Sequence, residues 1–80
     1  MQLPVIKDLV EKYDLGALRA AEDALLNEQE PAISIIGKDE GERLTHILAA
    51  MEILHDMEKN QLDYRTALRN YTQRVRNSIN

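Results

Sequence analysis

The 80-residue sequence contains no cysteine, no tryptophan and no phenylalanine. Without cysteine the chain can form no disulfide, supply no thiolate to a metal and carry out no thiol exchange. Small secreted domains usually need disulfides to be stable, so we expect a cytoplasmic protein. The aromatic side chains are three tyrosines, and the core is therefore expected to consist mainly of leucine and isoleucine.

Long apolar runs are also missing. No stretch approaches the ~20 consecutive apolar residues that cross a bilayer, and the first residues lack the basic and apolar regions of a signal peptide. We therefore expect no membrane partner. A chain of 80 residues supports one domain with a thin core, and we predict a single helical domain over residues 1–80.

Charge is distributed unevenly along the chain. The first 62 residues carry 6 basic and 13 acidic side chains and the last 18 carry 4 and 1, so the two parts have net charges of −7 and +3 and the whole has −4. An acidic body repels phosphate, so nucleic acid is not expected as a partner. The simplest interpretation is that the basic C-terminal segment packs against acidic helices.

Apolar residues recur at helical spacing in the first third of the chain. Residues 4–13 start with Pro4, which suits a first helical turn. Residues 14–28 follow, with Asp14 as the expected N-cap. Because Gly16 weakens the first turn of this second segment, the pattern is compatible with two helices or with one bent helix.

A long central helix is predicted over residues 39–59. Asp39 with Glu42 three residues later resembles a capping box. Apolar side chains cover more than half of the helix circumference, so we expect the helix to be covered on two sides. The residues left clearly polar are Glu42, Thr45, Glu52 and Asp56.

A final helix follows Asp63, its expected N-cap, and extends to Ile79. One face is apolar, and the opposite face carries Arg65, Arg69, Gln73 and Arg76. The central and final helices, joined by a short turn, outline a helix-turn-helix. A small DNA-binding regulator that uses the final helix is therefore the alternative function.

Between the second and central helices, residues 32–36 are rich in isoleucine and follow Pro31, which blocks helix continuation. The segment is expected to be extended, yet no second strand is visible elsewhere in the sequence. It is either a loop whose isoleucines pack on the helices or a strand that pairs with a second copy. The predicted fold is all-α, with three or four helices and this one extended segment.

We predict a homodimer on two grounds: the unpaired extended segment, and a central helix too apolar for one small chain to cover. The interface would combine that segment with the second face of the central helix. Its predicted residues are Ile33, Ile35, Ile36, His46, Ala50, Ile53 and Met57.

The two histidines, His46 and His55, are nine residues apart and point to opposite sides of the central helix. They cannot chelate one metal ion within that helix, and no nucleophile lies beside either in sequence. We expect each histidine to be partly buried and hydrogen-bonded to an acid or a backbone group, with Glu42 as one candidate partner of His46. We predict no catalytic residue, no metal site, no cofactor and no enzymatic activity.

Two further patterns do not match known sites. The acidic residues between positions 28 and 42 lack the ligand spacing of a calcium-binding EF-hand loop. The pair Gly37-Lys38 lacks the first glycine and the following Ser or Thr of a phosphate-binding loop. Both are interpreted as helix-capping and turn residues.

Three stretches are distinctive: the opening of the chain, the motif GKDEGERLTH over residues 37–46, and residues 67–76. Together they resemble a family of short bacterial helical proteins of unknown function. The resemblance implies an accessory role in thiol redox defence, since genes of such proteins lie near those of peroxiredoxins and thioredoxins. A chain without cysteine could only assist such enzymes. The leading function is therefore a non-catalytic binding or assembly protein.

Overall fold

The computed structural model describes residues 2–79, with side chains to Asn77, and these residues form four helices and no strand. The predicted all-α fold is confirmed. Tyr13 and Asp14 adopt extended backbone and separate the first two helices, so these are two helices and not one bent helix. The helices are α1 (Leu3–Lys12), α2 (Leu15–Leu26), α3 (Glu40–Asn60) and α4 (Tyr64–Ile79).

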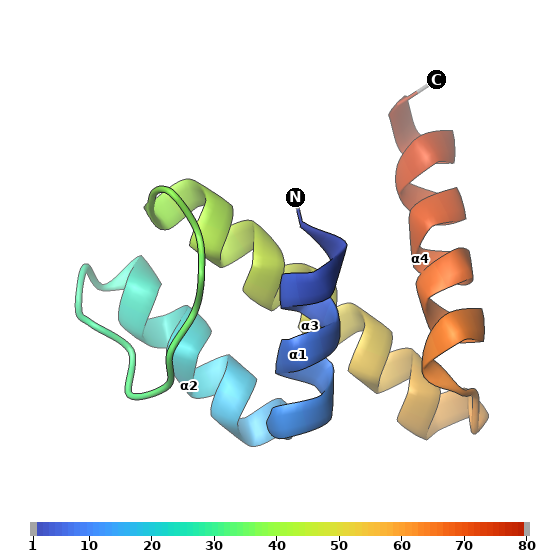
Figure 1. Cartoon of the computed structure of the whole chain (residues 1–80), viewed down its shortest axis with the longest axis horizontal. Helices are drawn as coiled ribbons and strands as arrows, with labels where there is room; N and C mark the ends of the chain where they lie inside the picture. Colours follow the sequence, from blue (N-terminus) through green and yellow to red (C-terminus); the bar gives the residue numbers. More distant parts are fainter. Residues whose placement is uncertain (1, 80) are drawn as a thin grey trace.

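α3 is the central element of the fold. Figure 1 shows it crossing the molecule, with α1 over its middle, α2 beside its first half and α4 at its far end. Each of these three helices packs against α3, and these are the main helix–helix contacts. The buried residues of α3 are His46, Ile47, Ala49, Ala50, Ile53, Leu54 and Asp56.

Leu48 stays 45% exposed, so the chain covers most but not all of the apolar surface of α3. Its apolar surface is wide because three helices of the same chain bury it, and burial of that surface is the main source of stability. Asp56, which belongs to the predicted polar strip, is only 9% exposed, because α4 packs over this part of α3. The periodicity of the sequence did not reveal how many helices would pack against α3.

Aspartates cap three of the four helices, as predicted. Asp14, Asp39 and Asp63 each accept a hydrogen bond from the backbone N–H three residues later, at 2.8, 2.8 and 2.9 Å. Such a cap typically contributes ~1 kcal/mol, because it satisfies a helix N–H that has no partner within the helix. The helix starts are thus fixed locally, before any tertiary contact is considered.

The cap of α4 has a pH-dependent contribution. Hydrogen bonds from Thr66, and then the charges of Arg65 and Arg69, hold the pKa of Asp63 below its usual value. The folded carboxyl therefore has a lower pKa than the unfolded one. Its stabilising contribution is present above the unfolded pKa and is lost as the pH falls through the folded pKa.

The segment that leads into α3 is fixed by side chains of the GKDEGER motif. Glu42 accepts a hydrogen bond from the backbone N–H of Lys38 at 2.9 Å, one residue earlier than in a standard capping box. Arg43 donates to Glu30 at 2.8 Å and so ties α3 to the preceding loop. A Cβ at Gly37 would lie 2.7 Å from Cγ and 2.9 Å from the backbone N of Arg43, so the close approach requires glycine.

Residues 32–36 form a loop within the chain and not a strand. Ile35 is buried in the core and Ile33 is half-buried, whereas Ser34 and Ile36 are exposed. This alternation is typical of extended backbone. The isoleucine packing agrees with the predicted loop, while pairing with a second copy stays a prediction.

No helix within residues 2–79 combines the length and the apolar character that are needed to cross a membrane.

We predict that Gly37→Ala lowers the free energy of unfolding by about 1–3 kcal/mol, the usual cost of forcing atoms into a filled space. Denaturant unfolding followed by circular dichroism measures the change. The matched control is Gly16→Ala in α2, whose Cβ would meet nothing closer than 3.5 Å. Because alanine favours helix, the control should leave stability unchanged or raise it by up to ~1 kcal/mol. Equal effects of the two substitutions would contradict the close-approach argument.

Candidate functional site

His46 is fully buried and joins three segments of the chain. Its Nε2 accepts a hydrogen bond of 2.9 Å from the backbone N–H of Gln2, next to the start of α1. Its Nδ1 lies 2.8 Å from the carbonyl oxygen of Ile36, in the loop before α3. The prediction of a buried histidine bonded to a backbone group is confirmed, although its partners are Gln2 and Ile36 and not Glu42.

These partners define the protonation state of the ring. A backbone N–H can only donate, so Nε2 must be the unprotonated acceptor. Nδ1 then carries the proton and donates it to the carbonyl of Ile36. Both ring nitrogens of this neutral tautomer are occupied inside the core, so His46 has no free position for a substrate or a metal ion.

His55 lies on the opposite side of α3, as predicted, but the prediction that it is partly buried is wrong, because it lies at the open groove between α2 and α3 and is exposed. It borders a groove of about 310 Å³ between α2 and α3 that also contains the carboxylate of Glu52. No serine, threonine or cysteine is among the groove residues, so the pair has no adjacent nucleophile. The groove is lined by Leu15, Arg19, Leu48, Met51, Glu52 and His55.

The residues of the predicted interface divide into two groups. Four of them are covered by the chain itself, namely Ile35, His46, Ala50 and Ile53. Three retain accessible surface, namely Ile33, Ile36 and Met57. The predicted dimer is not tested by a single chain, but only the second group can meet a partner without rearrangement of the core.

Ile36 belongs to an exposed apolar corner. Its side chain is 61% exposed, and that of Leu3 is 45% exposed. Since the ring of His46 bonds the carbonyl of Ile36 on one side and the N–H of Gln2 on the other, the two apolar residues lie near the same ring. Within the described residues, no backbone–backbone hydrogen bond involves positions 32–37. This corner, residues 33–37 with Leu3, therefore offers apolar side chains and, apart from the carbonyl of Ile36, backbone groups that no other backbone group pairs with.

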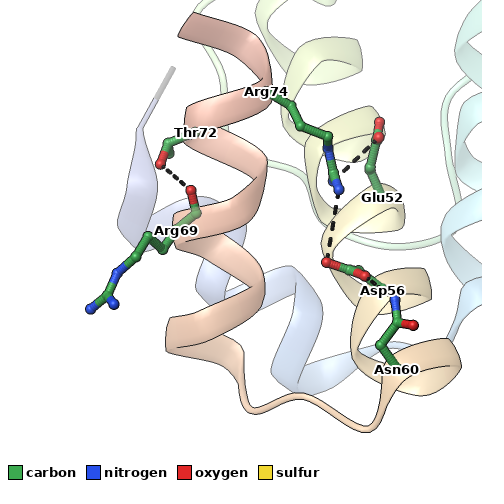
Figure 2. A network of polar contacts seen from close by, with 6 residues as sticks. All are labelled: Glu52, Asp56, Asn60, Arg69, Thr72 and Arg74. Carbon is green, nitrogen blue, oxygen red and sulfur yellow. Dashed lines mark hydrogen bonds and ion pairs between the residues drawn. The ribbon is translucent and has the colours of Figure 1, made fainter. Parts of the chain in front are cut away.

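The arginines of α4 point in two directions, and the sequence pattern revealed only one of them. The predicted basic face is exposed, and Figure 2 shows Arg69 extending away from α3. Arg74 instead points at α3, where it lies 3.4 Å from Glu52 and 3.9 Å from Asp56. The sequence analysis did not single out Arg74. The available signal was its place between Tyr71 and Val75 on the apolar face of the helix, where a charged side chain needs a partner.

Two tyrosines of α4 line the contact with the rest of the fold. Burial raises the pKa of Tyr64, with a smaller contribution from the negative charge of Glu11. Burial also raises the pKa of Tyr71. Both hydroxyls therefore stay protonated beyond the usual alkaline range, which does not suit a general base near neutral pH. In residues 2–79 there is also no group of three or more metal-ligating side chains placed to hold a metal ion.

The fold and its surfaces define a small all-α protein organised around one central helix. The chain belongs to a family of unknown function (DUF6952), whose model matches residues 1–80. No curated protein and no solved structure shows a significant match. The resemblance to a family of unknown function is confirmed in this general form, and the family description names no activity.

We predict that His46→Leu lowers the free energy of unfolding by about 2 kcal/mol or more, because it leaves a backbone donor and a backbone acceptor without partners in the core. The control is His55→Leu, an exposed position where the change should stay within ~0.5 kcal/mol. In the wild type, long-range ¹H–¹⁵N spectra should show the Nδ1-protonated tautomer for His46. A stable His46→Leu variant, or the Nε2-protonated tautomer, would show that the ring does not link these segments.

Proposed function

We propose that this protein is a non-catalytic binding or assembly protein that acts as a homodimer through the corner formed by residues 33–37 and Leu3. The observation that carries the proposal is that this loop segment has no backbone–backbone hydrogen bond in the described residues. Antiparallel pairing with the same segment of a second copy would satisfy those groups. It would also cover Ile36, which is 61% exposed.

The non-catalytic part of the proposal rests on the two histidines. His46 uses both ring nitrogens for backbone hydrogen bonds in the core. His55 shares its groove with a carboxylate but with no hydroxyl or thiol. General acid–base or nucleophilic chemistry needs a reactive group and a base within hydrogen-bond reach of a substrate, and neither histidine provides that arrangement.

A more specific version of this proposal is that the protein is an accessory factor of a thiol redox enzyme. It rests on the sequence resemblance. The absence of cysteine limits the chain to holding or assembling such an enzyme, because disulfide exchange needs a thiolate. A cytoplasmic location is part of the same proposal and rests on the same absence.

The homodimer is tested by light scattering of the wild type over a micromolar concentration series. We expect the measured mass to rise above the 9.2 kDa of one chain. Ile36→Lys should return the mass to that of the monomer, because it places a charge without a partner in the contact. Leu26→Lys is the matched control, since Leu26 is equally exposed but lies on α2. A mass of 9.2 kDa at all concentrations would exclude the dimer.

DNA binding by α4 is the second candidate function. The observation in its favour is the exposed face of α4 that carries Arg65, Arg69 and Arg76, none of which forms a salt bridge within the described residues. The net charge of −4 argues against DNA binding, because a negatively charged protein repels phosphate.

This candidate predicts that the wild type retards duplex DNA in an electrophoretic shift at low salt, where attraction to phosphate is strongest. Arg69→Glu should abolish the shift. Arg19→Glu, which makes the same charge change on α2, should reduce it only slightly. Unretarded DNA at low salt would remove DNA binding from consideration.

A further inference from the structure

A second groove, of about 480 Å³, lies where the C-terminal half of α3 faces α4. Most of its lining residues are polar, and Leu62 is the apolar exception. It contains the carboxylate of Asp56, the guanidinium of Arg74, and several carboxamides that come from both helices. The lining residues are Asp56, Asn60, Leu62, Asn70, Gln73, Arg74 and Asn77.

The one cation in this groove, Arg74, also pairs with Glu52, a carboxylate next to the groove and outside its lining. Figure 2 shows the guanidinium of Arg74 between the carboxylates of Glu52 and Asp56. The distances, 3.4 Å to Glu52 and 3.9 Å to Asp56, are long for charge-assisted hydrogen bonds. One cation is shared by two anions, so the cluster carries a net charge of −1 and is one positive charge short.

The missing hydrogen-bond donor can be assigned to one atom, Oδ2 of Asp56. Asp56 is 9% exposed, and its Oδ1 accepts a hydrogen bond from the side chain of Asn60. Its Oδ2 is buried and has no hydrogen-bond partner. A buried carboxylate oxygen without a donor is costly, so a ligand that supplies a charged donor gains the energy that the free protein lacks.

We propose that this groove binds a primary ammonium group. When the ligand binds, the guanidinium of Arg74, whose side chain is about half exposed, leaves Asp56 and pairs with Glu52 alone. This movement opens Oδ2 of Asp56 to the ligand. The ammonium then donates one hydrogen bond to Oδ2 and neutralises the cluster. This site is separate from the proposed dimer contact at residues 33–37.

The remaining groove residues complete the site. An ammonium group has three donors and needs three acceptors. Asn70, Gln73 and Asn77 follow each other at helical spacing along one side of α4. Each has a carboxamide oxygen that accepts hydrogen bonds without adding charge. They can supply the two acceptors that Asp56 does not.

The geometry favours ammonium over guanidinium as the ligand group. A guanidinium binds a carboxylate most strongly through two parallel hydrogen bonds, one to each oxygen. At Asp56 one oxygen is already taken by Asn60, so only one remains. A compact point charge with freely rotating donors suits a single open oxygen better than a planar fork.

The ammonium could be carried by a small free amine or by a lysine side chain of another protein. NMR titration of the ¹⁵N-labelled chain tests both sources, with 1,4-diaminobutane in one arm and the peptide acetyl-Gly-Lys-Gly-amide in the other. We expect chemical shift changes centred on the side-chain amides of Asn60, Asn70 and Asn77 in at least one arm. Binding of the diamine alone assigns a free amine, and binding of the peptide assigns a lysine side chain.

Two variants that each remove one positive charge distinguish binding in this groove from a general attraction of cations to an acidic protein. Arg74→Gln removes the competing cation from Asp56 and should tighten binding at least threefold. Arg76→Gln removes the same charge from the exposed face of α4 and should leave the affinity unchanged. Asp56→Asn should weaken binding at least tenfold. If Arg76→Gln tightens binding as much as Arg74→Gln, the proposal is wrong.

Tetramethylammonium provides the final control, because it has the charge of an ammonium group but no N–H donor. We expect no shift changes in the groove at concentrations where the amine saturates it. Equal binding of tetramethylammonium, shift changes spread over the acidic surface, or no change in either amine arm would each overturn the proposal.

Discussion

The imidazole of His46 holds together parts of the chain that no helix–helix contact joins. One ring nitrogen fixes the N–H that precedes α1, and the other fixes a carbonyl of the loop that precedes α3. A neutral histidine is suited to this place because it offers one acceptor and one donor about a ring width apart. α1 also packs on α3 directly, and His46 adds the link between the start of α1 and the 33–37 segment.

The most distinctive stretch of the sequence, GKDEGERLTH, has a structural explanation. Gly37 permits close approach, Asp39 and Glu42 cap the backbone, and Arg43 ties down the loop. The last residue of the motif is the bridging histidine. These residues of the motif thus start α3 and anchor the segments next to it.

Local features could be predicted from the sequence because their causes lie within a few residues of one another. The four helices, the three aspartate caps and the opposite orientation of the two histidines follow from helical spacing and capping chemistry. Features that depend on packing between distant segments could not be predicted in this way. The partners of His46 lie 44 and 10 residues away, and the burial of Asp56 depends on where α4 docks.

α4 buries less of its surface than α1 or α2, since Ala67 is its one buried residue among those described. It packs chiefly on the last part of α3 and follows a turn in which Gln61 adopts a left-handed backbone conformation, with φ of 54°. Helices with few packing partners are the first to open in the native state, because little buried surface must be exposed to release them. We therefore expect α4 to open before the core around α3. Amide exchange should be fastest in the C-terminal turns of α4 and slowest in the middle of α3, where three helices meet.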